Sequence, residues 1–115
     1  MIPEPAFSQN DYERRILLPL FAAIAPYDPE KILQYEWLNS RGAIARFERN
    51  TIEIRLLDIQ ECPLADIAIL FFISEIIRAF IEETLAPRKH QQTFDVLPLA
   101  EIFKRCIVDA EDSMI

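Results

Sequence analysis

Three charged residues of this 115-residue chain have types and spacing that could handle anionic substrates. Glu53 and Arg55 lie two residues apart in the alternating stretch Thr51–Asp58, "TIEIRLLD", and residues at that spacing in a strand share one face. A carboxylate binds divalent cations, and a guanidinium binds phosphate or carboxylate groups. The spacing alone leaves two interpretations open: one edge of a site for charged substrates, or a solvated ion pair.

The element that must position these residues is a β-hairpin. Residues 43–48 and 51–58 read as strands, and Arg49-Asn50 between them reads as a two-residue turn. This register places Arg46 opposite Glu53, where it either holds the carboxylate or contacts phosphate. One face is then charged, and the other is predicted to be apolar and buried against helices. The apolar set is Ala43, Ala45, Phe47, Ile52, Ile54 and Leu56.

Helical patterns flank the hairpin on both sides. We expect a helix capped by Ser8 and interrupted near Pro19, followed by a short second helix that begins at Asp28. After the hairpin, residues 64–85 predict a long helix that is apolar nearly all round, and Asp95 is placed to cap a last helix. This order predicts an α+β fold in which an antiparallel hairpin packs on helices.

The composition predicts one domain over residues 1–115 and narrows the classes of function. The net charge of −7 argues against nucleic-acid partners. The single glycine excludes a glycine-rich phosphate loop, and the single histidine excludes a multi-histidine metal site. The most apolar window, residues 67–74, is too short for a membrane span, and we expect a cytoplasmic protein without a membrane partner.

The stretch Trp37–Ile69 closely resembles the C-terminal part of the glutamate–cysteine ligase family 2 proteins, also called carboxylate–amine ligases. Three motifs in one order carry the resemblance: "RGAIARF", "IEIR" and D-x-Q-E-C-P-x-A-D. The likeness extends over roughly residues 11–83. Members of the family are much longer than this chain. The resemblance therefore implies a C-terminal segment of a catalytic fold like that of glutamine synthetase.

The family's activity is a step of glutathione biosynthesis that uses ATP and Mg²⁺. ATP phosphorylates the γ-carboxylate of glutamate, and the amine of cysteine or of another substrate then displaces phosphate. Carried over by position, the resemblance implies that Glu53 is a metal ligand and that Arg55 is a catalytic residue and an ATP contact. Arg46 becomes a second catalytic candidate. Thr51 departs from some members of the wider superfamily, which carry an arginine there, and the isolated segment is expected to be inactive.

A second reading makes the chain a non-catalytic interaction module that associates with itself. The long apolar helix is more than one hairpin and three short helices can cover, and the hairpin leaves two open strand edges. Either reading predicts a homo-oligomer for the isolated chain.

Overall fold

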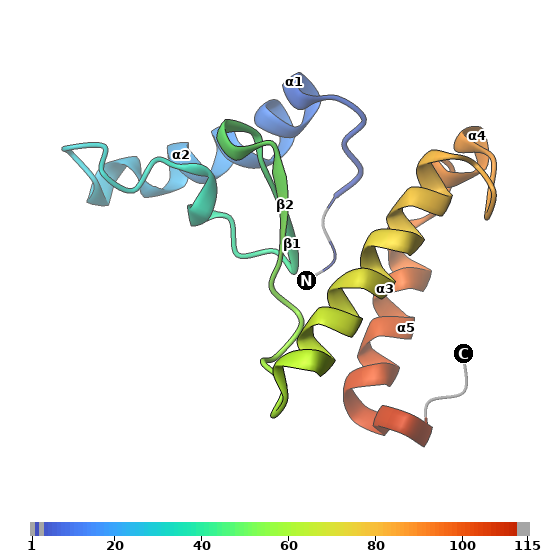
Figure 1. The fold of residues 1–115 in the computed structure, drawn as a ribbon. Helices are drawn as coiled ribbons and strands as arrows, with labels where there is room; N and C mark the ends of the chain where they lie inside the picture. The colour runs from blue at the N-terminus through green and yellow to red at the C-terminus, as the bar shows by residue number, and fades with distance from the viewer. Residues whose placement is uncertain (1, 3, 113–115) are drawn as a thin grey trace. The chain divides into compact units, whose positions relative to one another are not determined.

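The computed structural model describes residue 2 and residues 4–112 (Figure 1). Their regular secondary structure consists of helices and one two-stranded antiparallel sheet, so the predicted α+β class is confirmed. They fall into two compact units. One contains the residues up to Leu56 and those from Asp95 onward, and the other is Leu57–Phe94. The extent of a single domain over residues 1–115 stays a prediction.

The first helical segment begins where the sequence predicts. Helix α1 covers Gln9–Tyr12, a π-helical turn covers Glu13–Leu17, and α2 covers Leu18–Ile24. The Ser8 hydroxyl accepts a hydrogen bond from the backbone N–H of Asp11 at 3.1 Å, which is the geometry of a helix N-cap.

The interruption expected near Pro19 takes the form of that π-helical turn. The backbone N–H of Leu18 donates to the carbonyl of Glu13, five residues earlier, instead of four. Because a proline ring collides with the carbonyl four residues before it in a regular helix, a widened turn ahead of the ring relieves the clash. Ile16 and Leu17 in this turn are buried and belong to the small core of the unit.

The prediction of a helix that begins at Asp28 is wrong. Asp28 is buried, and its two carboxylate oxygens accept from the backbone N–H groups of Ile32 and Leu33, each at 2.9 Å. Lys31, which lies between Asp28 and Ile32, has a φ of 56°, and a right-handed helix does not accommodate this angle. The carboxylate therefore closes a turn, and the next helical piece is the single 3₁₀ turn Glu36–Leu38.

The hairpin pairs β1, Ala43–Arg46, with β2, Thr51–Ile54. The two-residue turn predicted at Arg49-Asn50 is wrong: the connection is the four residues Phe47–Asn50, of which the first three form a 3₁₀ turn. Asn50 adopts the left-handed conformation, with φ of 51°. The positive φ expected of this asparagine is confirmed, although the turn around it is longer.

The longer turn moves the register by two residues. Arg46 lies opposite Thr51, and Glu53 lies opposite Ile44, so the predicted cross-strand pair of Arg46 and Glu53 is wrong. A shift of two residues equals the side-chain period of a strand. The division into a charged face and an apolar face therefore survives the error.

The burial of the two faces is opposite to the prediction. Ile44, on the charged face, is only 1% exposed, whereas Ile52 and Ile54 on the apolar face are 60% and 37% exposed. The physical reason is that the segment Glu36–Asn39 makes its hydrogen bonds with the charged side chains and covers that side. The apolar side of β2 remains open in this unit.

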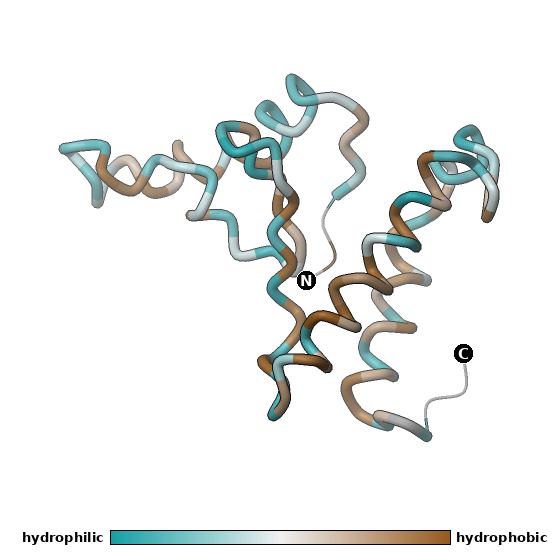
Figure 2. Tube along the Cα trace, in the orientation of Figure 1, coloured by the Kyte–Doolittle hydropathy of each residue, from teal (hydrophilic) through white to brown (hydrophobic). Residues whose placement is uncertain are grey.

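The long apolar helix is confirmed, with different limits. Helix α3 covers Pro63–Ile81, and Figure 2 shows apolar residues along most of its length. Glu83, with φ of 60°, ends the helix, and the N–H of Thr84 returns to the carbonyl of Ala79 at 2.9 Å. Among the described residues, no helix combines the length and apolar character needed to cross a membrane.

Two shorter helices complete the chain. A four-residue helix α4, Arg88–Gln91, lies between α3 and the last helix. Helix α5 covers Val96–Asp109, and the carboxylate of Asp95 accepts from the N–H of Leu97 at 3.2 Å, as predicted for its cap.

Candidate functional site

The hairpin brings together the three residues predicted to do chemistry. Arg46 donates from Nη1 to Oε2 of Glu53 at 2.7 Å, and Arg55 donates from Nε to Oε1 of Glu53 at 2.8 Å. Each carboxylate oxygen thus has its own guanidinium partner. We call these three residues the Arg46–Glu53–Arg55 cluster.

Glu36 extends the cluster at the Arg46 end. Its Oε2 accepts from Nε of Arg46 at 3.3 Å, and its Oε1 accepts from the backbone N–H of Phe47 at 2.8 Å. The side chains of Glu36 and Arg46 are only 13% and 15% exposed. Sequence reasoning missed Glu36, because it fell inside a helix that does not form.

Arg55 is also held by main-chain carbonyls. Its Nη1 donates to the carbonyl oxygen of Asn39 at 2.6 Å, and the carbonyl oxygen of Trp37 lies 3.5 Å from both Nη atoms. The guanidinium is thereby fixed by a carboxylate on one side and by backbone acceptors on the other. Such a fork-shaped donor loses little freedom when it binds in a preset orientation.

Asn39 is the other residue that sequence reasoning missed. Its side chain is fully buried, and its Nδ2 donates to the hydroxyl of Tyr12 at 2.7 Å. Its Oδ1 accepts from the backbone N–H of Arg41 at 3.1 Å and from Nη1 of the same residue at 3.1 Å. The one signal available was the turn pattern of residues 39–42, since asparagine often bonds the backbone two residues onward.

The electrostatics of the cluster favour its charged form. Hydrogen bonds from Arg55 and then Arg46 hold the pKa of the Glu53 carboxyl below its ordinary value. The same contact with Glu53 raises the pKa of the Arg46 guanidinium. At neutral pH the cluster therefore holds two positive charges around one negative charge, with Glu36 as a second carboxylate beside Arg46.

Acid should weaken the fold in a way that depends on Glu53. Because its pKa is lowered in the folded state, the folded chain binds fewer protons than the unfolded chain just below the ordinary glutamate value of about 4.3. The stabilisation is present above that value and is lost as the pH falls through the folded pKa. Urea unfolding between about pH 3 and pH 6 should show a shallower pH dependence in Glu53→Gln than in the wild type.

Glu48→Gln is the matched control for this measurement, since Glu48 is an exposed glutamate of the same hairpin. The control removes a glutamate charge from the hairpin without removing either hydrogen bond between Glu53 and the two arginines. Equal pH dependence in the wild type and in Glu53→Gln would contradict the assignment of the pKa shift to the two arginines.

The described residues do not offer a ready magnesium site. No group of three or more histidine, cysteine, aspartate or glutamate side chains gathers anywhere in that part of the chain. Both oxygens of Glu53 are also engaged by arginines. A Mg²⁺ ion therefore does not fit the cluster as it stands, and the role of Glu53 as a metal ligand stays a prediction.

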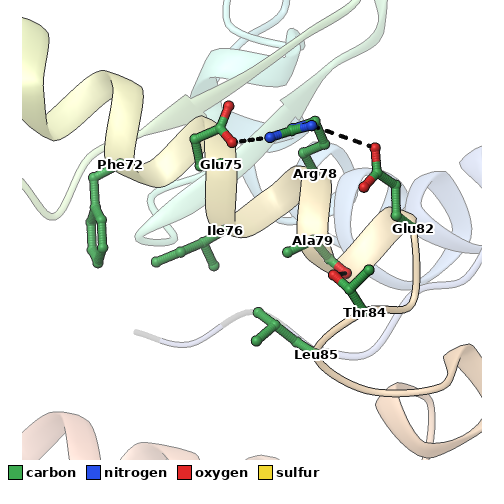
Figure 3. Close-up of a pocket in the computed structure, with 8 residues that line it drawn as sticks. All are labelled: Phe72, Glu75, Ile76, Arg78, Ala79, Glu82, Thr84 and Leu85. Atoms are coloured by element: carbon green, nitrogen blue, oxygen red, sulfur yellow. Dashed lines mark hydrogen bonds and ion pairs between the residues drawn. The ribbon is translucent and has the colours of Figure 1, made fainter.

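A second feature is an apolar groove at the C-terminal end of α3. Figure 3 shows Phe72, Ile76 and Leu85 on one side of the helix, while Arg78 joins two glutamates on the other. Those glutamates are Glu75 and Glu82, the latter 3.8 Å from Arg78. Apolar side chains supply most of the exposed surface of the groove, although charged residues are also part of its lining.

The comparisons with known proteins give one relative of much greater length. An uncharacterized protein of Archaeoglobus fulgidus is 41% identical to this chain over 83 residues. Those residues are 72% of this chain but only 22% of the archaeal protein, so the chain spans about a fifth of that relative. No family model matches the chain, and no solved structure matches it.

Proposed function

We propose that this chain is the C-terminal segment of an ATP-dependent carboxylate–amine ligase similar to the glutamate–cysteine ligases of family 2. The observation that carries the proposal is the Arg46–Glu53–Arg55 cluster, in which two guanidiniums are held in one orientation on a strand pair. Groups that are already oriented stabilise charge developing in a transition state without reorganising during the reaction.

The proposed chemistry has two steps, and both develop negative charge. The γ-carboxylate of glutamate attacks the terminal phosphorus of ATP, ADP leaves, and an acyl phosphate forms. The amine of cysteine or another substrate then attacks the acyl carbon, an amide bond forms as the nitrogen loses a proton to water or to the departing phosphate, and phosphate leaves with the bonding electrons. Arg46 and Arg55 would neutralise the phosphoryl oxygens with the N–H groups that they do not already donate to Glu36, Glu53 and the Asn39 carbonyl.

The open side of the hairpin supports a place in a larger sheet. Ile52, Ile54 and Leu56 are exposed, and the two strands have no further strand beside them in the described residues. A two-stranded sheet alone is marginal in water. A sheet like that of glutamine synthetase would supply strands and helices to cover these groups.

The described residues of the chain offer no ready position for Mg²⁺. Mg²⁺ is usually bound by one or two carboxylates together with phosphate oxygens and water. Glu53 is the one carboxylate that the resemblance assigns to it, and both of its oxygens are taken. No step of the proposed reaction is therefore assigned to a metal held by these residues.

The archaeal relative provides the test. The segment of that protein matching this chain would be replaced with the present sequence, and the chimera would be given ATP, Mg²⁺, glutamate and cysteine. We expect phosphate release that needs glutamate and an amine, together with a γ-glutamyl product identified by mass spectrometry. The isolated chain should release none, because it has no glycine-rich loop. An inactive chimera beside an active archaeal parent, or an active isolated chain, would contradict the proposal.

The exposed apolar residues of α3 favour a second candidate function, that of a self-associating module. Large apolar side chains of this helix are exposed by 60% or more, and they are Leu64, Ile67, Leu70, Phe71, Phe72 and Ile81. A single small domain rarely leaves so much apolar surface to water.

The isolated chain should therefore be a dimer or a larger oligomer. Light scattering after gel filtration should give at least twice the chain mass of 13.4 kDa at tens of micromolar. Phe71→Glu should lower that mass, because a carboxylate cannot be buried in an apolar contact without a large cost. Phe94→Glu is the control, since Phe94 is similarly exposed but lies outside the helix. A monomeric wild type would contradict the prediction.

A further inference from the structure

One short segment contacts both arginines of the cluster. Glu36 holds Arg46 through its carboxylate, and the carbonyl oxygens of Trp37 and Asn39 receive the guanidinium of Arg55. The segment lies before the hairpin in the sequence, so these contacts are not part of the strand pairing. The orientation of the arginines therefore depends on what holds this segment in place.

The side chain of Asn39 ties the segment to its surroundings. It is 0% exposed, and it joins Tyr12 in α1 to Arg41 through its amide group. The Tyr12 hydroxyl also accepts from the backbone N–H of Ala45 in β1 at 3.2 Å. The carbonyl that receives Arg55 belongs to Asn39, and the side chain of the same residue is connected through Tyr12 to a helix and a strand.

We infer that Asn39 is a positioning residue that sets the direction of the Arg55 guanidinium. It acts through Arg55 and touches no substrate itself. Only the purpose of that orientation rests on the proposed function, whereas the orientation itself is a property of the chain. A buried polar network of this kind is strongly coupled, because removal of one member leaves the others unsatisfied.

The inference is tested on the 115-residue chain by nuclear magnetic resonance. The Nε–H of Arg55 donates to Glu53 at 2.8 Å, so its exchange with water reports how firmly the guanidinium is held. Asn39→Ala should speed that exchange by about tenfold, because the loop carrying the carbonyl acceptors loses its anchor. Asn10→Ala is the matched control, since Asn10 is an exposed asparagine of α1 and should leave the exchange unchanged.

Two further variants keep the test decisive if Asn39→Ala fails to fold. Tyr12→Phe retains the ring that packs against Phe47 and removes only the hydroxyl, so it should speed the exchange in the same direction. Asn39→Asp keeps an acceptor for Arg41 and offers one to the Tyr12 hydroxyl, so it should stay close to the wild-type rate. Far-UV circular dichroism confirms which variants are folded.

Unchanged exchange at Arg55 in a folded Asn39→Ala or Tyr12→Phe chain would overturn the inference. Equal acceleration in Asn10→Ala would also overturn it, since the effect would then not come through the network. In the chimera, Asn39→Ala should lower kcat far more than it alters the KM for glutamate, and Asn39→Asp should restore much of the loss. A chimera without turnover would count against the proposed function alone, because the exchange measurement does not depend on activity.

Discussion

Replacing Arg55 by alanine should reduce the glutamate-dependent phosphate release of the chimera by about 10²–10³-fold, because one preoriented charge-stabilising group is lost. Arg55→Lys should recover only part of the rate. A lysine keeps the charge, but it cannot reproduce the fork that reaches Glu53 and the carbonyl of Asn39 together. Steady-state kinetics with glutamate as the varied substrate would measure both effects.

The control for this prediction is Arg49→Ala. Arg49 lies exposed in the hairpin turn and makes no contact with the cluster among the interactions described, so its loss should leave the rate within about twofold. Arg55 also donates a hydrogen bond to the carbonyl of the buried residue Asn39, so its loss should lower the free energy of unfolding by about 1–3 kcal/mol. Unfolding must be measured beside the kinetics. A stable Arg55→Ala chimera with wild-type turnover would mean that the Arg46–Glu53–Arg55 cluster has only a structural role.

Ile44→Ala should lower the free energy of unfolding by about 2–5 kcal/mol, as is usual for a fully buried large aliphatic side chain. Ile44 is 1% exposed and lies on the charged face of the hairpin, opposite Glu53. The loss should appear as a lower urea midpoint with an unchanged slope, since the same surface is exposed on unfolding.

Ile52→Ala is the matched control on the opposite face. Ile52 is 60% exposed, so its truncation should change stability by no more than about 0.5 kcal/mol in a monomeric sample. The sequence alone predicts the reverse order, because it places Ile52 in the buried apolar set and leaves Ile44 outside that set. If Ile52→Ala proves the more damaging variant, the burial of the two faces described above is wrong.

Features set by neighbouring residues were predictable from the sequence. The caps at Ser8 and Asp95 depend on groups two or three positions away, and both form as expected. The long helix follows from its unbroken apolar pattern. Glu53 and Arg55 were placed together correctly because strand geometry alternates every residue.

Features set by distant partners were not predictable in this way. Asn39 meets Tyr12 across 27 residues, and Glu36 meets Arg46 across 10, so no local pattern marks either contact. The helix expected after Asp28 was lost because that carboxylate satisfies backbone groups of a turn instead of a helix end. Propensity is a weak guide wherever tertiary contacts offer such an alternative.

The choice of the buried face shows the same limit. Alternation identifies two faces, but it does not say which one meets the rest of the chain. The charged face is covered here because its guanidiniums and carboxylates find fixed partners in the segment before the hairpin. An apolar face predicts the buried side of a hairpin only when the polar side chains of the other face have no hydrogen-bond partners elsewhere in the chain.

The π-helical turn Glu13–Leu17 has a consequence for rotational phase. Each residue of an α-helix turns the chain by about 100°, so the extra residue in the widened turn offsets α1 from α2 by slightly more than a quarter of a turn. Tyr12 lies immediately before that offset, and its hydroxyl reaches Asn39 from there. A single-residue deletion inside the turn would restore regular pitch and rotate the hydroxyl away. The rotation of one short helix therefore decides whether Tyr12 can hold Asn39, whose carbonyl receives Arg55.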